Sequence, residues 1–381
     1  MEIPLRRWLA SLLVLLAAGC GSTPTEPPAE LTEFEPELQV TTLWSVQVGE
    51  GAGKRDLRLR PALDGERIYL NDHRGVVVAL QAESGKQLWR VDLQLPLSSG
   101  PGIGEGMLLL GSAEGELLAL ASDDGRVLWR AQLSSEILAP PAAGSGVVVA
   151  HTGDGKLFGL KAGDGSQLWI YDRSVPTLTL HGTSSPVILS DLVLDGFASG
   201  KVALLSLADG RVLWETAVAT PRGRTELERM VDIDAPPLVI GETAYVVGYQ
   251  GRAAALDLRS GRVLWSRPAS SAGRLASDGE ALYLTDDGDR VLALSRSGGA
   301  SLWQQDALQR RSLTPPEVYR ESVVVGDGEG YLHWLARSDG RFQARAKLSG
   351  AIRTAPLAAE GRLYVYGRKG RLTCLEATPR Q

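Results

Sequence analysis

The sequence has few of the residues that most often build metal, disulfide and nucleophilic sites. It contains two cysteines, Cys20 and Cys374, and four histidines whose spacing matches no metal-ligand pattern. Neither a Gly-x-Ser-x-Gly elbow nor a phosphate-binding Walker loop occurs. The acidic runs at 286–289 and 327–329 resemble turns and lack the ligand order of a calcium loop. These absences predict a chain with no catalytic residues, no metal site and no cofactor.

The charge composition gives no sign of a nucleic-acid partner. The 381 residues carry a formal net charge of −5, and 22% of them are charged. No basic patch stands out along the chain, whereas nucleic-acid-binding proteins usually have one. We therefore expect an ordinary soluble globular protein that does not bind nucleic acid.

A short apolar run near the N-terminus takes the place of a membrane-spanning segment. Two arginines precede apolar residues from Trp8 to Ala18, a run too short to cross a bilayer but typical of a secretory signal. It ends in Leu-Ala-Ala-Gly before Cys20, which resembles the bacterial lipobox. We predict a lipoprotein signal peptide over 1–19, and a lipidated flexible tether, rich in Pro, Thr and Glu, over 20–40.

Lipid on Cys20 would anchor the chain to a membrane without a transmembrane helix. Gly21 follows, whereas many inner-membrane lipoproteins carry Asp there, so the lipobox resemblance implies the periplasmic face of the outer membrane. Cys374 is expected to be a buried core thiol. With Cys20 lipidated it has no partner, and we expect no intrachain disulfide. For Cys20, the alternative to a lipobox is an ordinary cleavage site that contains a cysteine by chance.

What the sequence does contain is a repeat of about 40 residues. Each copy has a Gly, a Leu five residues later and a Trp fourteen residues after the Gly, as in 112–129. The Leu column holds Leu80, Leu120, Leu160, Leu205, Leu256, Leu294, Leu335 and Leu375. The Trp column holds Trp89, Trp129, Trp169, Trp214, Trp265 and Trp303, followed by Ala344. A repeat of this length with strand-like segments is typical of a β-propeller, in which each copy forms one blade.

Each copy predicts four strands. The first often follows Pro, the second is a β-branched or aromatic run, and the last two carry the Leu and Trp columns. Asp-Gly pairs such as Asp124-Gly125 join the last two strands, since Gly supplies the positive φ of a tight hairpin. The Trp side chains are expected to pack between neighbouring blades. The predicted fold is therefore an all-β, eight-bladed propeller of four-stranded antiparallel blades.

The eighth copy stops after Leu375, before it could reach its Trp. The segment Leu43-Trp44-Ser45-Val46 lies unpaired at the other end of the chain. We predict that this N-terminal strand completes the last blade and that Trp44 joins the Trp column. Closure would protect the two edges that a linear array exposes. Residues 41–381 are then one domain.

Two insertions interrupt the regular spacing, within 170–186 and 215–236. Long loops on a rigid scaffold are where binding usually resides, so these two are the candidate interaction surface. Variable loops without a binding role are the alternative.

The Asp-Gly-x-x-Leu-Trp ending of the repeat resembles the blades of quinoprotein dehydrogenases, which bind pyrroloquinoline quinone (PQQ). The alcohol-oxidising members carry a vicinal cysteine pair against the cofactor, and this chain has none. No calcium-and-Asp constellation is evident either. The repeat therefore indicates the fold and does not imply the cofactor.

A second resemblance covers essentially the whole mature chain. The lipobox, the eight blades and the segments 176–182, 232–234 and 328–334 are similar to the BamB family, the propeller lipoproteins of the outer-membrane β-barrel assembly (BAM) machine. This resemblance implies binding to the POTRA domains of the barrel subunit BamA. The residues it implies are Leu178, Leu180, His181, Asp232 and Asp234. The family commonly has Arg where this chain has His181.

The resulting hypothesis is a non-enzymatic scaffold that helps deliver unfolded outer-membrane proteins to BamA for insertion. A PQQ-dependent periplasmic dehydrogenase is the main alternative. A propeller that binds a small ligand in its central channel is the other.

Overall fold

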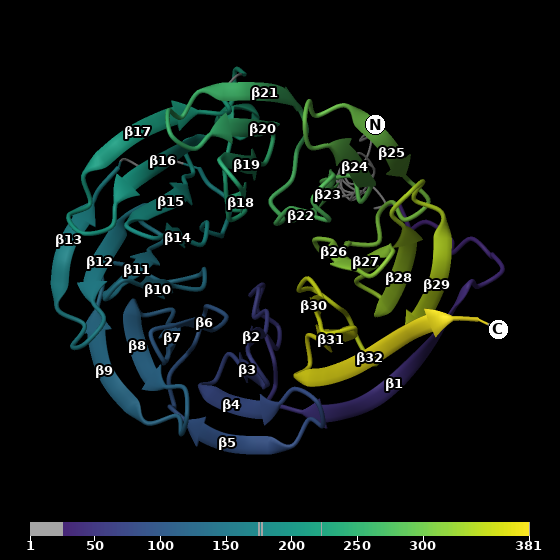
Figure 1. The fold of residues 1–381 in the computed structure, drawn as a ribbon, viewed down its shortest axis with the longest axis horizontal. Helices are drawn as coiled ribbons and strands as arrows, with labels where there is room; N and C mark the ends of the chain where they lie inside the picture. Colours follow the sequence, from purple (N-terminus) through teal and green to yellow (C-terminus); the bar gives the residue numbers. More distant parts are fainter. Residues whose placement is uncertain (1–25, 174–175, 177, 222, 381) are drawn as a thin grey trace, which may run out of the picture.

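The structure, a computed structural model, describes residues 26–173, 176, 178–221 and 223–380. Eight four-stranded antiparallel sheets form a ring around a central axis (Figure 1). The predicted eight-bladed propeller is confirmed. Each blade runs outward from a short inner strand to a long outer strand (Figure 1).

The first four blades follow one another directly along the chain. Blade one contains β2 (Ala62–Asp64), β3 (Arg67–Asn71), β4 (Val76–Gln81) and β5 (Gln87–Asp92). Blade two contains β6 (Gly102–Gly104), β7 (Met107–Gly111), β8 (Glu116–Ala121) and β9 (Val127–Gln132). Blade three contains β10 (Ala142–Gly144), β11 (Val147–His151), β12 (Leu157–Lys161) and β13 (Gln167–Tyr171). Blade four contains β14 (Val187–Leu189), β15 (Leu192–Gly196), β16 (Lys201–Ser206) and β17 (Val212–Ala217).

The last four blades complete the ring. Blade five contains β18 (Leu238–Ile240), β19 (Thr243–Val247), β20 (Arg252–Asp257) and β21 (Val263–Pro268). Blade six contains β22 (Ala276–Ser277), β23 (Ala281–Thr285), β24 (Val291–Ser295) and β25 (Ser301–Gln305). Blade seven contains β26 (Glu317–Tyr319), β27 (Ser322–Gly326), β28 (Tyr331–Ala336) and β29 (Phe342–Lys347). Blade eight contains β30 (Leu357–Ala359), β31 (Arg362–Tyr366), β32 (Arg371–Pro379) and β1 (Leu38–Gln47).

The N-terminal strand closes the ring as predicted. β1 pairs antiparallel with β32, from Leu38 opposite Pro379 to Gln47 opposite Arg371. The two ends of the described chain therefore share one blade, and no blade of the ring is left incomplete among these residues.

The Trp column lies between neighbouring blades. Trp129 is 8% exposed, and its indole Nε1 donates to the carbonyl of Ala162 in blade three at 2.7 Å. Its ring covers Gly165 in the next hairpin so closely that a Cβ there would lie 2.5 Å from the ring. Trp44 makes the same kind of contact with blade one, donating to the Glu83 carbonyl at 2.9 Å. The hairpin glycine thus supplies both its positive φ and the space for the indole.

In blade seven, the Trp and the small residue that faces it lie on the opposite strands from those in the other blades. In the other blades the Trp faces a smaller residue of the neighbouring strand, as Trp129 faces Ala119. In blade seven, Trp334 lies on the inner of these two strands and faces Ala344 on the outer. The large and small side chains have exchanged strands, so Trp334 is fully buried and fills the volume that the missing column Trp would leave.

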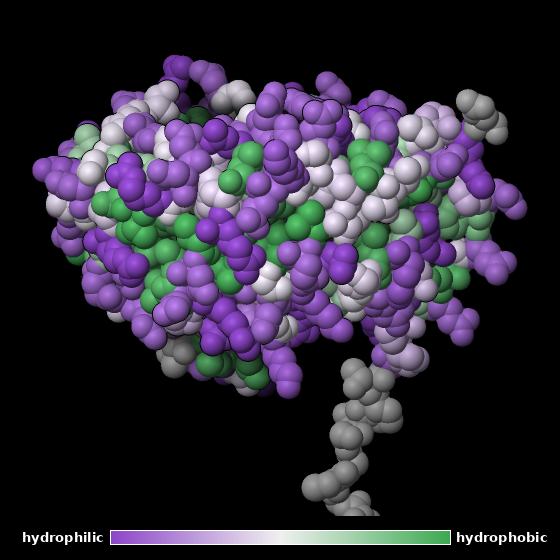
Figure 2. All heavy atoms as spheres, turned by 90° about the horizontal axis from the view of Figure 1, so that it is seen from below, coloured by the Kyte–Doolittle hydropathy of each residue, from purple (hydrophilic) through white to green (hydrophobic). Residues whose placement is uncertain are grey.

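The outer rim is not uniformly polar. An exposed leucine immediately precedes each column Trp, with between 40% and 57% of its surface accessible. These residues are Leu43, Leu88, Leu128, Leu168, Leu213, Leu264 and Leu302. Figure 2 shows apolar side chains along the rim, interrupted by hydrophilic ones.

Residues 26–37, which we call the N-terminal strap, lie along blade seven. The sequence predicts a flexible tether over 20–40, but the part of it that the structure describes is packed. Phe34 stacks on Phe342 with ring centroids 5.3 Å apart, and the Glu37 amide donates to the Gln343 carbonyl at 2.8 Å. The packed chain therefore begins before residue 41.

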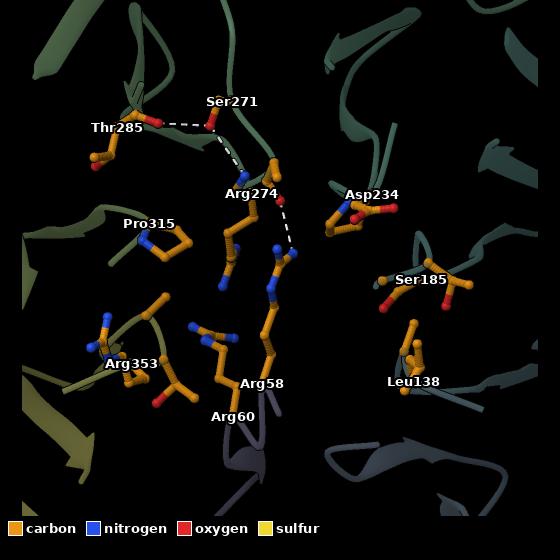
Figure 3. Close-up of a pocket in the computed structure, with 18 of the residues that line it drawn as sticks. Arg58, Arg60, Leu138, Ser185, Asp234, Ser271, Arg274, Thr285, Pro315 and Arg353 are labelled. Carbon is orange, nitrogen blue, oxygen red and sulfur yellow. Dashed lines mark hydrogen bonds between the residues drawn. The ribbon is translucent and has the colours of Figure 1, made fainter. Parts of the chain in front are cut away.

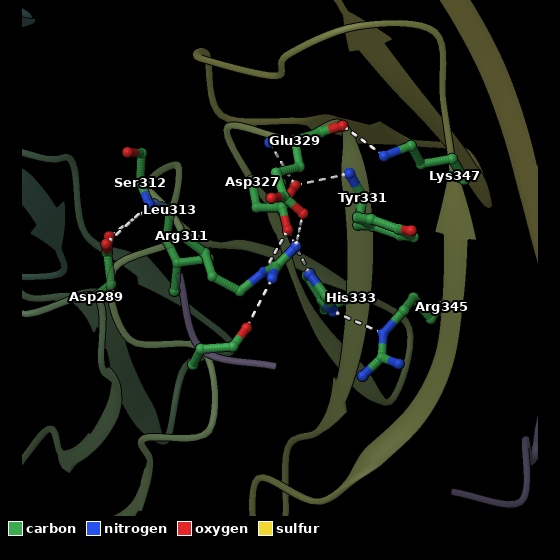
Figure 4. A network of polar contacts seen from close by, with 12 residues as sticks. Asp289, Arg311, Ser312, Leu313, Asp327, Glu329, Tyr331, His333, Arg345 and Lys347 are labelled. Atoms are coloured by element: carbon green, nitrogen blue, oxygen red, sulfur yellow. Dashed lines mark hydrogen bonds and ion pairs between the residues drawn. The ribbon is translucent and has the colours of Figure 1, made fainter. Parts of the chain in front are cut away.

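A buried polar network holds the start of the strap (Figure 4). Arg311 donates to the Ala29 carbonyl, to Asp327 at 2.8 Å and to Glu329 at 2.6 Å. His333 Nε2 lies 3.2 Å from the same Asp327 carboxylate. Burial alone would raise the pKa of Asp327, but hydrogen bonds, chiefly from His333, lower it to about 2. The segment 328–334, on which the family resemblance partly rests, thus has a structural role.

Candidate functional site

The two insertions predicted from the repeat spacing lie on one face of the propeller. The first connects β13 to β14 and the second connects β17 to β18 (Figure 1). Because neighbouring strands run antiparallel, such connections emerge at the same end as the turns between the second and third strands of a blade. A bridge from Asp232 to Tyr249, in the turn between β19 and β20, fits this placement. We call this side of the ring the loop face.

The first insertion presents an apolar side chain to solvent. Leu178 is 41% exposed and His181 is also exposed, whereas Leu180 is half-buried. The His181 Nε2 atom lies 3.4 Å from the carboxylate of Glu136, which belongs to the connection between β9 and β10. Leu178 and His181 are therefore accessible to a second molecule, and Leu180 is only partly so.

Asp232 and Asp234 are buried rather than exposed. Asp232 is 1% exposed and Asp234 is 3% exposed. One carboxylate oxygen of Asp232 accepts a hydrogen bond from the Leu180 amide at 3.1 Å. Gly182 lies so close to Asp234 that a Cβ there would be 2.3 Å from a carboxylate oxygen. The structure thus brings all five predicted residues together, but it places the two aspartates beneath the loop.

Burial dominates the electrostatics of this pair. It raises the pKa of Asp232, and the neighbouring Asp234 charge raises it further. Burial likewise raises the pKa of Asp234. Two neighbouring carboxyl groups that are shielded from water keep a proton up to a higher pH than an exposed aspartate does. The contact beneath the loop therefore has a charge that depends on pH.

A buried contact between a histidine and an aspartate lies in the same region and was not predicted. His151 Nδ1 is 2.9 Å from Asp195 Oδ2, and both side chains are almost fully buried. His151, Gly182, Asp232 and Asp234 all line one small cavity under the first insertion. His151 and Asp195 are 44 residues apart and lie in different blades, so sequence spacing alone gave no signal for the pair.

The second insertion carries the short helix α2 (Glu226–Arg229). Thr225 caps it, since the Thr225 hydroxyl accepts from the Glu228 amide while the Glu228 carboxylate accepts from the Thr225 amide. Leu227 on this helix is 65% exposed, more than any other large apolar side chain that the structure describes. It is a second exposed apolar side chain on an insertion, and the predicted set of five omits it.

The described residues contain neither a metal-binding cluster nor a membrane-spanning helix. Within them, no group of three or more His, Cys, Asp or Glu side chains is arranged to hold a metal ion. Their helices include none with the length and apolarity needed to cross a bilayer. Cys374 is a buried free thiol opposite Trp44, and burial raises its pKa to about 11. The predicted lipidation site, Cys20, lies outside the described residues.

Comparison with known proteins relates the whole chain to one family. A family model described as outer membrane protein assembly factor BamB matches residues 73–305 and 288–380. The chain is 53% identical to the outer membrane protein assembly factor BamB of Pseudomonas aeruginosa, over 94% of this chain and 96% of that protein. The crystal structure of BamB from Moraxella catarrhalis has a TM-score of 0.82 at 27% identity, covering 89% of this chain and 100% of that one.

A quinoprotein also shares the architecture. The quinohemoprotein alcohol dehydrogenase of Comamonas testosteroni has a TM-score of 0.71 at 13% identity, covering 88% of this chain and 76% of that one. At this identity the likeness indicates the fold alone. Family model, sequence identity and fold agree with the resemblance drawn from the repeat and the loops, and the chain belongs to the BamB family of outer-membrane protein assembly factors.

Proposed function

We propose that this protein is a non-enzymatic scaffold subunit of the BAM machine, and that its loop face binds the POTRA domains of BamA. Its membership of the BamB family supports the assembly role. The observation that carries the site is the first insertion, in which exposed Leu178 and His181 stand on a loop fixed from below by Asp232. Fixing a loop before binding lowers the entropy that the complex must lose.

The five predicted residues divide into two roles in this proposal. Leu178, Leu180 and His181 contact the partner. Asp232 and Asp234 act as positioning residues, because their burial leaves them no surface to offer. Leu227 of α2 adds a second apolar contact on the loop face.

We further propose that lipid on Cys20 holds the protein at the periplasmic face of the outer membrane. The N-terminal strap would then lie between the anchor and the ring. Radioactive palmitate labelling of the wild type and of Cys20→Ala tests this, because only the wild type should incorporate label and remain with the membrane fraction.

The partner site is tested by capture of the purified periplasmic region of BamA. Leu178→Asp should weaken binding by about tenfold or more, since exposed apolar anchors at the centre of an interface are often worth 2 kcal/mol or more, roughly thirtyfold. The matched control is Leu264→Asp, because Leu264 is 44% exposed but lies on the outer rim. Equal capture by Leu178→Asp and the wild type would overturn the site assignment.

Asp232→Asn separates the two proposed roles. Asn keeps an acceptor for the Leu180 amide, so binding should persist, whereas Asp232→Ala removes the acceptor and should weaken capture without touching the exposed surface. If both variants lost binding equally, the aspartate would contact the partner directly.

A further inference from the structure

The axis of the propeller contains a cavity of about 540 Å³ (Figure 3). Its wall is built from segments that precede the inner strands, including the stretch before β2, the stretch before β22 and the stretch before β30. Sites for small molecules typically occupy about 300–1,000 Å³, so this cavity is large enough for a compact organic ligand.

Four arginines line this cavity: Arg58, Arg60, Arg274 and Arg353. In Figure 3 the side chains of Arg58 and Arg60 enter from one wall and that of Arg274 from the opposite wall, and their guanidinium groups meet in the open space. Arg353 stands to one side of them. The residues come from distant parts of the chain, and only the ring closure assembles them.

Five aspartates share the lining with the four arginines, but the carboxylate that contacts Arg60 and Arg274 is that of Glu317. Glu317 Oε2 lies 3.3 Å from Arg60 Nη2 and 3.6 Å from Arg274 Nη1, so one carboxylate serves two guanidinium groups. Burial, with the nearby charge of Arg274, lowers the pKa of Arg60 to about 10, which is still well above neutral pH. The guanidinium groups of Arg60 and Arg274 therefore repel each other.

Two nitrogens of the cluster have no hydrogen-bond partner within the described chain. They are Arg60 Nε and Arg274 Nη1, and the second has only the longer ion-pair contact with Glu317, at 3.6 Å. Arg58 uses one nitrogen, Nη1, to donate to the Ala272 carbonyl at 2.8 Å, which holds its guanidinium in the cavity. Buried donors in native proteins are nearly always paired with protein, water or an ion, so these call for an acceptor.

The acidic side chains of the lining meet this need only in part, and the charge of Asp234 interacts with that of Arg58. They are Asp56, Asp234, Asp286, Asp287 and Asp289. Asp286 forms an ion pair with Arg290, and Asp289 accepts from the backbone amides of the loop at 312–313. Asp287 accepts from the Ser270 hydroxyl, and Asp234 belongs to the buried pair on the loop face. None of the acidic side chains in this lining forms an ion pair with the four arginines.

We infer that the central channel is a binding site for a small soluble anion that carries two or more carboxylate or phosphate groups. The fork of an arginine matches both groups with two parallel hydrogen bonds, and several forks around one space favour a multivalent anion. Arg58, Arg60, Arg274 and Arg353 supply the donors, and the anion supplies the acceptors that Glu317 alone does not provide to Arg60 and Arg274. The cavity shares His181 and Asp234 with the partner site on the loop face, whereas the four arginines lie outside that site.

Isothermal titration calorimetry of the full-length protein with citrate and with pyrophosphate tests this inference, at ionic strength held constant with sodium chloride. Saturable binding of either probe is expected, and the stronger of the two identifies the preferred anionic group. Arg274→Gln should weaken it by at least tenfold, and Arg353→Gln should weaken it as well. Arg353→Gln also serves as the second variant, should the loss of Arg274 perturb the fold through Glu317.

The matched control is Arg259→Gln, because the Arg259 side chain is 83% exposed on the rim and lies outside the cavity. Its affinity for both probes should equal that of the wild type within twofold. Absence of saturable binding for both probes at millimolar concentration would overturn the inference. An equal loss of affinity in Arg259→Gln and Arg274→Gln would also overturn it, since the binding would then reflect overall charge.

Discussion

The rim and the loop face hold their parts in place by different chemistry. On the rim, an indole covers a hairpin glycine and donates to a backbone carbonyl of the next blade, as Trp129 does with Gly165 and Ala162. On the loop face, a buried carboxylate accepts from the amide of Leu180. The first contact recurs around the ring and carries no charge, whereas the second ties one insertion to a carboxyl group that titrates. Repetition therefore builds the scaffold, and a local contact positions the loop.

The largest expected effect is on the rim. Trp129→Ala should lower the free energy of unfolding by about 3–5 kcal/mol, because it leaves a cavity between two blades and an unpaired carbonyl. Leu178→Asp, on the loop face, should change it by no more than about 0.5 kcal/mol. Urea denaturation followed by tryptophan fluorescence and circular dichroism measures both. Similar losses in the two variants would show that the loop is part of the scaffold.

A smaller effect on the rim isolates the contact with glycine. Gly165→Ala places a methyl group 2.5 Å from the Trp129 ring and keeps a φ of +72°. Gly146→Ala is its control, because φ is +77° there and a Cβ would meet nothing within 4 Å. We expect a loss of about 1 kcal/mol for the control from backbone strain alone and about 2–3 kcal/mol for Gly165→Ala. Equal losses would mean that the indole does not depend on the glycine.

The smallest expected effect is a difference between the loop face and the rim in how stability depends on pH. Since the pKa of Asp232 is raised in the folded state, its contribution to stability is complete below the unfolded value of about 3.9 and declines as pH rises through the folded pKa. Asp232→Asn removes this decline and should gain on the order of 1 kcal/mol relative to the wild type between acid and neutral pH. Denaturation at several pH values measures it, and Trp129→Ala should show no such trend.

The sequence was sufficient for the scaffold because the scaffold repeats. The Leu and Trp columns, the hairpin glycines and the missing last Trp predicted eight blades and the closure by Trp44. The exchange of Trp and Ala between strands in blade seven could not be predicted without the strand register. Trp334 and Ala344 face each other only when β28 and β29 are paired.

The site could be predicted only in part, since the sequence of a loop does not show which of its side chains are buried. The pattern Asp-Ile-Asp at 232–234 suggests exposed charge, yet the bridge to Tyr249 and the overlying loop bury both carboxyls. The strap at 26–37 was not predicted because its composition is that of a tether. Its contacts include hydrogen bonds from Arg311, in the connection before β26, and from Arg345 of blade seven. The arginines of the channel are dispersed along the chain and form a cluster only in three dimensions.

The pairing of β1 with β32 also sets the order in which the molecule can become complete. Ser45 and Thr373, whose hydroxyls are 3.4 Å apart, are separated by 328 positions along the chain. During synthesis, the first strand of the ring must wait for the last one to be made, and until then blade eight has an open edge. Contacts between such distant segments form late and slowly. Completion of this propeller therefore depends on a strand far from β1 along the chain, and a chain that stops before β32 leaves β1 without its partner.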